Sequence, residues 1–194
     1  SSMSVYGDLK NNKALANEKS KCKPLSFYGI SKLSSERYLK TFSKLGLNVT
    51  ILRFFNVYGP NQNLKNLRQG MISIYLGQLL KSDNILVKGS LKRFRDFIYI
   101  DDVVKIIYLC ANKKITKNKT YNISTGNKTT VKKIISLISE ITEKKFKIKQ
   151  SKSTPGDQFG IYAKPSLLKR DLNFKKFTSL KSGIKKMIQS INYD

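Results

Sequence analysis

Asn48-Val49-Thr50-Ile51-Leu52-Arg53-Phe54 is a run of β-branched and apolar residues, as a strand buried within a parallel sheet requires. A helix is expected just before it, from Phe27 to Leu45, with Ser26 as its N-cap and Gly46 at its end. The carboxyl end of the strand leads into the pair Phe55-Asn56. Because open α/β sheets bind their ligands at that end of the strands, this pair is a candidate for a binding site.

Strand and helix patterns alternate along the rest of the chain. Strands are expected at 85–87, 97–100, 119–123 and 146–149, and helices at 71–80, 101–111, 130–142 and 179–191. Residues 1–4 are interpreted as the end of a further strand, followed by a loop over 6–25. Asp101-Asp102 is expected to cap its helix. This alternation, without an internal repeat, predicts an α/β fold.

The formal charge of the chain is +26, with 38 Lys and Arg against 12 Asp and Glu. Such a charge leaves a basic, polyanion-binding module as one alternative. However, the lysines are scattered among Asn and Ile, arginines number only six, and no aromatic-plus-basic repeat of an RNA-binding module occurs. We therefore interpret most of the charge as solvated surface and expect no nucleic-acid partner.

Cysteine and histidine usage restricts the kinds of site that the chain can hold. Cys22 and Cys110 are far apart in the sequence, and histidine is absent. A zinc site or a disulfide framework therefore has little support, so we expect no metal and reduced thiols in the cytoplasm. No apolar run approaches the roughly 18 residues of a transmembrane helix, so no membrane partner is expected.

The pentapeptide Tyr28-Gly29-Ile30-Ser31-Lys32 is the strongest catalytic candidate from the residues themselves. A tyrosine and a lysine four positions apart on a helix share one face. The ammonium group of Lys32 can then stabilise the phenolate form of Tyr28, which a tyrosine general base requires. A solvated helix face is the alternative for this spacing alone.

Four further segments accompany this pentapeptide in a fixed order. They are Ser1-Ser2-Met3-Ser4-Val5-Tyr6-Gly7, Leu52-Arg53-Phe54-Phe55-Asn56-Val57-Tyr58-Gly59-Pro60, Arg93-Phe94-Arg95-Asp96-Phe97-Ile98-Tyr99-Ile100-Asp101-Asp102-Val103 and Tyr121-Asn122-Ile123-Ser124-Thr125-Gly126. Together the five segments closely resemble the extended short-chain dehydrogenase/reductase family, in particular its sugar-nucleotide epimerase/dehydratase branch with UDP-glucose 4-epimerase. The resemblance covers nearly the whole chain.

The resemblance implies the C-terminal part of a Rossmann-type parallel sheet plus a smaller α/β substrate-binding domain. Residues 1–56 and 97–124 would form the NAD-binding Rossmann side, and 57–96 and 125–194 most of the substrate-binding domain, with the active cleft between them. Family members begin with a Gly-x-x-Gly-x-x-Gly turn that binds the dinucleotide pyrophosphate, and this chain contains none. We therefore expect a C-terminal portion of the family's fold, and a catalytically silent fragment stays an alternative.

Catalytic roles follow from the resemblance residue by residue. Tyr28 would be the catalytic acid/base, and Lys32 would bind the nicotinamide ribose while stabilising the phenolate. Ser2 would be the catalytic hydroxyl that holds the reacting sugar hydroxyl, with Ser1 and Ser4 as rivals for the same contact. An ordinary serine at a strand end is the alternative for Ser2.

Binding roles are implied for the segments that follow. Phe55 would contact the nicotinamide, with an ordinary core aromatic as the alternative. Asn56 and Arg95 would contact the diphosphate of the nucleotide-sugar, with an Arg95 to Asp96 ion pair as the structural alternative. The backbone at Leu86-Val87 is a candidate edge for recognising the base. In addition, Arg93 is expected at the surface, and Gly156-Asp157-Gln158 is expected to form a turn.

The two positions after the catalytic hydroxyl discriminate among reactions of the family. Dehydratases of the family have acids there, whereas this chain has Met3 and Ser4, which cannot do acid/base work. Epimerisation is therefore favoured, with NAD as cofactor, NADP left open, and a UDP-hexose changed at C4 through a 4-keto intermediate. A nucleotide-sugar reductase or dehydratase stays an alternative. The resemblance also implies a homodimer.

Overall fold

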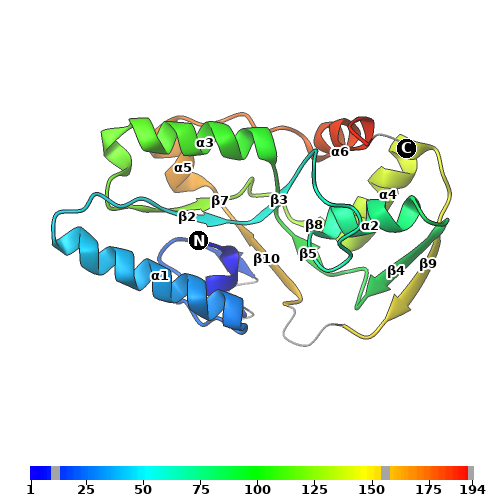
Figure 1. Ribbon diagram of the computed structural model, residues 1–194, viewed down its shortest axis with the longest axis horizontal. Helices are drawn as coiled ribbons and strands as arrows, with labels where there is room; N and C mark the ends of the chain where they lie inside the picture. Colours follow the sequence, from blue (N-terminus) through cyan, green and yellow to red (C-terminus); the bar gives the residue numbers. More distant parts are fainter. Residues whose placement is uncertain (10–13, 154–157, 192–194) are drawn as a thin grey trace.

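The computed structural model describes residues 1–9, 14–153 and 158–191 (Figure 1). Its strands are β1 (Leu15–Ala16), β2 (Ile51–Phe54), β3 (Asn56–Tyr58), β4 (Asn84–Lys88), β5 (Phe94–Arg95), β6 (Phe97–Tyr99), β7 (Thr120–Ile123), β8 (Thr129–Thr130), β9 (Lys147–Ser151) and β10 (Gly160–Ala163). Its helices are α1 (Phe27–Lys44), α2 (Met71–Leu79), α3 (Ile100–Asn112), α4 (Val131–Thr142), α5 (Ser166–Leu172) and α6 (Leu180–Gln189). Short 3-10 helices cover Met3–Val5 and Lys114–Thr116.

Parallel pairing dominates the strands. β2 runs parallel to β7, from Ile51 opposite Thr120 to Phe54 opposite Ile123, and Ser2 adds one parallel bridge to Phe54. β3 with β6 and β4 with β9 are also parallel pairs. The fourth sheet has the order β1-β10-β5-β8, in which only the edge strand β8 is antiparallel. The predicted α/β class with a parallel sheet is confirmed.

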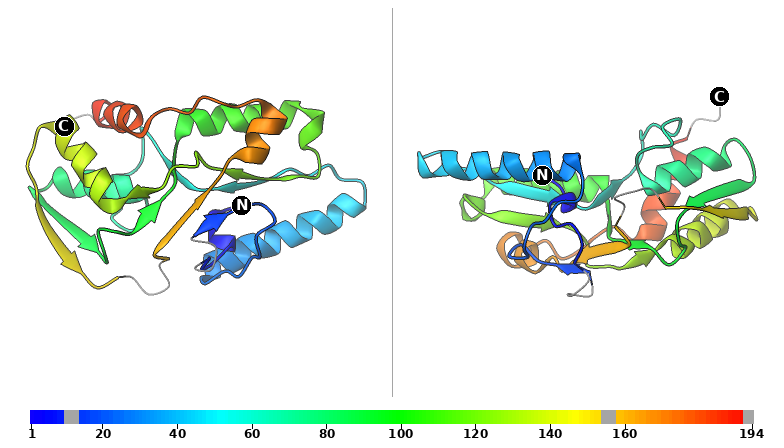
Figure 2. Two further views of the ribbon diagram at one scale, coloured as in Figure 1. Left: turned by 180° about the vertical axis from the view of Figure 1, so that it is seen from behind. Right: turned by 90° about the horizontal axis from the view of Figure 1, so that it is seen from below.

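The elements form two lobes that are joined by strands running through the middle of the molecule (Figure 1). In one lobe, α3 and α5 lie on one side of β2 and β7, and α1 runs along the other side (Figure 2). The other lobe contains β4 and β9 together with α2, α4 and α6. β3 and β10 lie between the two groups, so residues at the ends of these strands are placed between the lobes.

The apolar core is divided in the same way. One cluster joins α3, β7 and α5 through Ile106, Tyr121, Ile123, Leu168 and Leu172, with others. A second joins α2, β4, α4 and α6 and includes Leu76, Val87, Ile134, Ile138 and Ile184. A third lies under the N-terminal segment and consists of Val5, Tyr6, Ala16, Phe55, Ile161 and Ala163. Residues 160–172 thus pack with the lobe of β2 and β7. The predicted division into an NAD-binding side and a substrate-binding domain stays a prediction.

Several predicted elements are confirmed by the structure. The Ser26 hydroxyl accepts a hydrogen bond from the Gly29 amide at 3.1 Å and caps α1. Just after that helix, Gly46 has φ +97°, a conformation that favours glycine. The predicted strands at 85–87, 97–100, 119–123 and 146–149 correspond to β4, β6, β7 and β9. The four predicted helices correspond to α2, α3, α4 and α6.

Other local expectations were wrong. Of residues 1–4, expected to be a strand end, Ser1 and Ser2 do pair with Phe54 at the end of β2, but Met3–Val5 turns into a 3-10 helix that the Ser2 side chain caps. Asp101-Asp102 does not cap α3, because Tyr99 is the N-cap residue; instead Asp102 accepts hydrogen bonds from the amide and hydroxyl of Thr178. The short elements β1, β5, β8, β10 and α5 were not predicted, since two to seven residues carry too little periodicity.

Cys22 and Cys110 are free thiols, and Cys110 is buried. Within the described ranges, no helix combines the length and the apolar character that crossing a membrane requires.

Candidate active-site cleft

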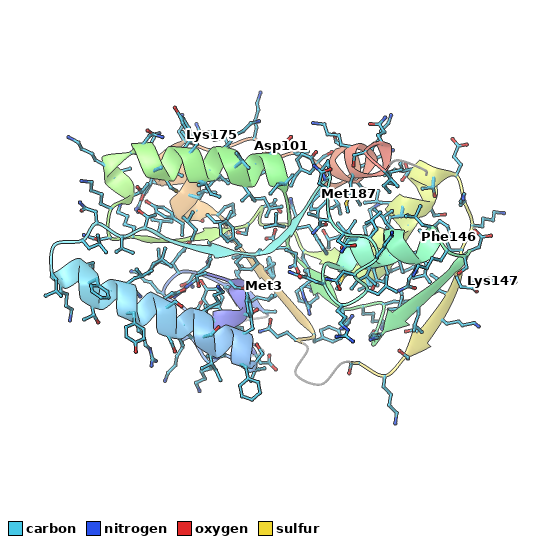
Figure 3. The ribbon with its side chains drawn as sticks, in the orientation of Figure 1. Met3, Asp101, Phe146, Lys147, Lys175 and Met187 are labelled. Carbon is cyan, nitrogen blue, oxygen red and sulfur yellow. The ribbon has the colours of Figure 1, made fainter. Side chains whose placement is uncertain are left out.

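Two adjoining cavities lie between the lobes and bring the predicted residues together. The first, about 1130 Å³ and here called the tyrosine cavity, is lined by Ser2, Tyr28 and Phe55. The second, about 1230 Å³ and here called the arginine cavity, is lined among others by Leu86, Arg93, Arg95 and Gln158. The two cavities share the lining residues Met3, Ser4, Asn56, Arg68, Gln69, Gly70 and Met71. Figure 3 shows Met3 near the centre of the molecule, where the cavities meet.

Tyr28 reaches the tyrosine cavity because α1 packs unusually close to the 3-10 turn that follows Ser2. A methyl group at Gly29 would lie only 2.6 Å from the Ser4 carbonyl oxygen and 2.9 Å from Pro24 Cβ. Gly29 therefore permits a backbone approach that no other residue allows. This close approach places Tyr28 and Ser2 on the lining of the same cavity.

Lys32 lies one turn further along α1, as predicted. Its Nζ is 5.5 Å from the centroid of the Tyr28 ring, within the range of a cation–π contact. Lys32 is half-buried, whereas 55% of Tyr28 is exposed. The structure therefore confirms that the two side chains share one helix face.

Ser2 is fixed at the carboxyl end of β2. Its backbone pairs with Phe54, and its hydroxyl lies 3.2 Å from both the amide and the hydroxyl of Ser4. The rival Ser1 is engaged elsewhere, because its hydroxyl donates a 2.6 Å hydrogen bond to the Glu36 carboxylate. Of the three N-terminal serines, Ser2 and Ser4 thus have hydroxyl groups next to each other at the cavity lining.

A buried ion pair attaches α1 to β2. Arg53 Nε and a terminal nitrogen bind the two carboxylate oxygens of Glu36 at 2.8 and 2.7 Å. Arg53 also donates to the hydroxyl of Tyr6, which donates to Asn122. Burial acts to raise the pKa of Glu36, but the hydrogen bonds from Arg53 and Ser1 hold that pKa below its ordinary value. Burial also raises the pKa of Tyr6 to about 12, so Tyr6 is a neutral hydrogen-bonding group.

Asn56 lies where the two cavities meet. Its backbone N–H and its side-chain Nδ2 both donate to the carbonyl oxygen of Asp96 at 3.1 Å. The Asp96 carboxylate itself binds Thr125, Gly126 and Ala163, and no ion pair joins it to Arg95 among the described residues. Burial raises the pKa of Asp96 to about 6, although these hydrogen bonds act to lower it.

Arg95 is buried but turned toward the arginine cavity. Its guanidinium donates to the carbonyl oxygens of Phe94, Phe159 and Gln158 at 2.7 to 3.3 Å. Gln158 lines the same cavity, while Gly156 and Asp157 of the expected turn lie outside the described residues. The expectation for Arg93 was wrong, because only 7% of it is exposed and it lines this cavity beside Arg95.

The two residues of the predicted base edge, Leu86 and Val87, point to opposite faces of β4. The Val87 side chain is fully buried in the core of the second lobe, whereas Leu86 is 45% exposed and lines the arginine cavity. The Leu86 N–H donates to Gln78 Oε1 at 2.6 Å, and Gln78 Nε2 donates to the Leu86 carbonyl at 3.3 Å. Because β4 alternates its backbone groups, Leu86 presents this donor and acceptor on the side away from β9.

The residues present fit the reacting end of a nicotinamide cofactor. The tyrosine cavity has room for a ring. Its lining includes the aromatic side chain of Phe55 and the hydroxyl groups of Ser2, Ser4 and Tyr28. Lys32 supplies a cation beside Tyr28. The glycine turn that binds a dinucleotide pyrophosphate is not in the sequence. No cluster of three or more His, Cys, Asp or Glu that could hold a metal occurs within residues 1–9, 14–153 and 158–191.

Sequence reasoning missed several residues of the cleft. Arg68, Gln69 and Gly70 line both cavities from the loop before α2, and Gln78 lies on α2 itself. The loop carries no periodic pattern, so nothing in the sequence marks its position. Gly29 did carry a signal, since a glycine inside a helix lowers its stability and implies a packing reason.

The chain is similar to several known proteins. A family model described as "NAD dependent epimerase/dehydratase family" matches residues 1–124. "Uncharacterized UDP-glucose epimerase YtcB" of Bacillus subtilis is 33% identical over 185 residues, which cover 95% of this chain and 56% of that protein. The dTDP-4-dehydro-6-deoxyglucose reductase of Escherichia coli is 32% identical over 165 residues, 84% of this chain and 52% of that protein.

A solved structure is similar over almost the whole chain. The UDP-glucuronic acid 4-epimerase from Bacillus cereus, crystallised with UDP-glucuronic acid and NAD, matches with a TM-score of 0.89 and 28% identity. The match covers 98% of this chain and 59% of that one. The chain thus spans a little more than half the length of the relatives that it matches.

Proposed function

The chain belongs to the NAD-dependent epimerase/dehydratase family, and from this membership we propose that it supplies the acid/base and substrate-binding parts of a nucleotide-sugar epimerase that acts on a UDP-hexose at C4. The observation that carries the proposal is the meeting of two cavities at Asn56, with Tyr28 and Ser2 in one and Arg95 in the other. The lobe of β2 and β7 is proposed as the NAD-binding side, and the lobe of β4 and β9 as the substrate-binding side.

The proposed chemistry assigns one task to each residue. The Tyr28 phenolate removes the proton of the sugar 4-hydroxyl and later returns it, and Lys32 stabilises that phenolate. The Ser2 hydroxyl holds the reacting oxygen by a hydrogen bond. A bound NAD would supply hydride acceptance and hydride return at C4, the redox chemistry by which the sugar would pass through a 4-keto form. Phe55 covers the reacting end of the cavity and excludes water.

The composition of the cleft favours epimerisation over elimination of water. Elimination needs additional acid/base groups, and Met3 and Ser4 occupy the two positions after Ser2. Within the described part of the chain, neither cavity has an Asp or Glu in its lining. A C4 epimerisation requires only Tyr28 with its cofactor, so the available groups suffice.

The arginine cavity suits a diphosphate. Among the described residues, six cationic ones line it: Arg68, Lys81, Lys88, Arg93, Arg95 and Lys149. Clustered cations raise the local concentration of anionic ligands, and guanidinium groups match the geometry of phosphate oxygens. Asn56 and Arg95 are therefore the proposed diphosphate contacts, and Ser4 is a proposed sugar contact at the border of the two cavities.

The Leu86 backbone is the proposed base contact in place of the predicted Val87. A backbone N–H and C=O side by side match a ring edge that carries C=O next to N–H. Uracil has such an edge, and cytosine offers the same order of acceptor and donor through its ring N3 and its amino group, so the edge suits a pyrimidine base. The carboxamide of Gln78, which binds this edge with the same pattern, supports the assignment.

Location and assembly complete the proposal. We propose a cytoplasmic location, for which the free thiols Cys22 and Cys110 are support. We also propose a homodimer in the whole enzyme. Large apolar side chains exposed along α1 support it, namely Phe27, Ile30, Tyr38, Phe42 and Leu45.

The test is an NMR assay of the sugar products. The 194-residue chain, and the same chain joined behind the N-terminal part of the Bacillus subtilis relative, are incubated with NAD⁺ and UDP-glucose, UDP-galactose or their N-acetyl forms. We expect the joined protein to interconvert the sugars at C4, with no net accumulation of NADH and with C4 deuterium kept in the product.

Other outcomes of this assay would assign a different function. A stable 4-keto-6-deoxy product would indicate a dehydratase, and steady consumption of added NADPH a reductase. If the joined protein binds NAD⁺ but changes none of these sugars, the epimerase proposal is wrong. Salt-sensitive retention of nucleic acid without UDP binding would indicate a basic binding module.

A further inference from the structure

Asp96 occupies the junction of four separate segments of the chain. It lies between β5 and β6 and is fully buried. Its Oδ1 accepts hydrogen bonds from the Thr125 amide at 2.9 Å and the Thr125 hydroxyl at 2.7 Å. Its Oδ2 accepts from the Gly126 amide at 2.9 Å and the Ala163 amide at 3.4 Å. One carboxylate thus joins the turn after β7 and the end of β10.

The backbone of the same residue holds Asn56. The Asp96 carbonyl oxygen is the acceptor for both the amide and the side-chain Nδ2 of Asn56, each at 3.1 Å. Asn56 is one of the seven described residues that line both cavities, and Arg95 precedes Asp96 in the chain. The orientation of Asp96 therefore determines where an amide and a guanidinium are presented to the cleft.

We propose that Asp96 is a positioning residue for diphosphate binding: its carboxylate, clamped by Thr125, Gly126 and Ala163, fixes the carbonyl that orients Asn56 and the backbone that carries Arg95. This inference rests on the proposed function for the identity of the ligand. It assigns to Asp96 no contact with the ligand itself.

The chemistry of the clamp explains why a carboxylate is needed. Four donors converge on two oxygens, and a carboxylate is an acceptor on every lone pair. Asparagine has nearly the same shape, but its NH₂ group would face amide donors and leave them unpaired. A buried donor without a partner is costly, so the segment is expected to shift until the donors find other acceptors. The shift moves Asn56 and Arg95 together.

The test compares three variants of the 194-residue chain by titration calorimetry with UDP. Asp96→Asn disrupts the clamp, and Thr125→Val removes only the hydroxyl donor. Asp171→Asn is the matched control, because Asp171 is also buried and accepts hydrogen bonds from Lys119, Tyr121 and Arg170, but it lines neither cavity. We expect UDP affinity to fall about tenfold in Asp96→Asn, about threefold in Thr125→Val, and not in Asp171→Asn.

A second readout follows Asn56 without any ligand. The side-chain amide signals of Asn56 in a nitrogen-15 NMR spectrum are expected to move in Asp96→Asn and Thr125→Val, and to stay in place in Asp171→Asn. If Asp96→Asn binds UDP as tightly as the unaltered chain, the positioning role is overturned. Equal weakening by Asp171→Asn would also overturn it, since general destabilisation would then explain the loss.

The two proposals can fail separately. An unaltered chain that binds no UDP contradicts the proposed function of the arginine cavity. The Asn56 signals would still decide whether the Asp96 clamp orients that side chain. Unchanged Asn56 signals in Asp96→Asn would contradict the inference whatever the result with UDP.

Discussion

Glu36 and Arg53 form a two-pronged ion pair at 2.8 and 2.7 Å that joins α1 to β2, and each is at least 97% buried. Glu36 is one of only two buried residues of α1, the other being Gly29. The helix that carries Tyr28 is therefore joined to β2 by this ion pair, while Gly29 packs against the Ser4 carbonyl and Pro24, and Leu33 packs on the third core cluster. Arg53 meets Glu36 on the face of β2 opposite the α3 core, because its neighbours Leu52 and Phe54 pack in that core and successive strand residues point to opposite sides.

We expect Glu36→Gln to destabilise the chain by about 3 to 5 kcal/mol, because it leaves the Arg53 charge buried without its partner. Urea unfolding followed by circular dichroism measures the change. Glu140→Gln is the control, since it removes an ion pair between exposed side chains, Glu140 and Lys181, and is expected to leave the midpoint unchanged. Similar midpoints for both variants would contradict the anchoring role of Glu36.

In the joined enzyme used to test the proposed function, Tyr28→Phe is expected to lower turnover about 10²- to 10⁴-fold, because it removes the acid/base group. Lys32→Met is expected to lower turnover as well, because the phenolate loses its neighbouring cation. Tyr108→Phe, at an exposed tyrosine of α3, is the control and should leave turnover unchanged. Turnover near that of the unaltered enzyme in Tyr28→Phe, with chemistry rate-limiting, would remove Tyr28 from the mechanism.

Gln78→Ala is expected to tighten UDP binding several-fold, because the carboxamide no longer competes for the Leu86 backbone edge. Calorimetry of the 194-residue chain with UDP and with inorganic pyrophosphate checks this. Pyrophosphate is the control ligand, since it has no base to bind the edge, and its affinity should change little. If both ligands gain equally, the edge is not a base contact and Gln78 merely fills space.

Two buried carboxyl groups are expected to give the stability of the chain opposite pH dependences. Burial raises the pKa of Asp96 from 3.8 to about 6, so between these values the folded state holds a proton that the unfolded state has released. This group therefore makes the free energy of unfolding fall, by about 3 kcal/mol, as the pH rises from 3.8 to about 6.

The hydrogen bond from Arg170, with those from Lys119 and Tyr121, holds the pKa of Asp171 well below its ordinary value. Its contribution is present above pH 3.8 and is lost as the pH falls further.

Urea unfolding between pH 3 and 7 measures both effects as differences between the unaltered chain and a variant. As the pH rises to about 6, the free energy of unfolding of the unaltered chain should fall relative to that of the Asp96→Asn variant. The unaltered chain should have a higher free energy of unfolding than the Asp171→Asn variant, and this excess should shrink as the pH falls below 3.8. Parallel curves for the unaltered chain and Asp96→Asn would show that Asp96 does not titrate in this range.

The sequence by itself was enough for features that depend on neighbouring residues. The buried strand at Ile51–Phe54, the cap at Ser26 and the shared face of Tyr28 and Lys32 follow from residue type and spacing along a few turns or pleats. The order of the motifs also led to the family, because each motif is a local string. These predictions required no knowledge of which segments meet in space.

Tertiary structure decided the features that depend on contacts between distant segments. The acceptors of Asp96 come from residues 125, 126 and 163, the partner of Arg53 from α1, and the place of Arg93 in the cavity wall from the fold of the second lobe. The base edge shows the same limit on a small scale. A strand alternates its faces, so a shift of one residue exchanges the exposed Leu86 for the buried Val87, and only packing sets that register.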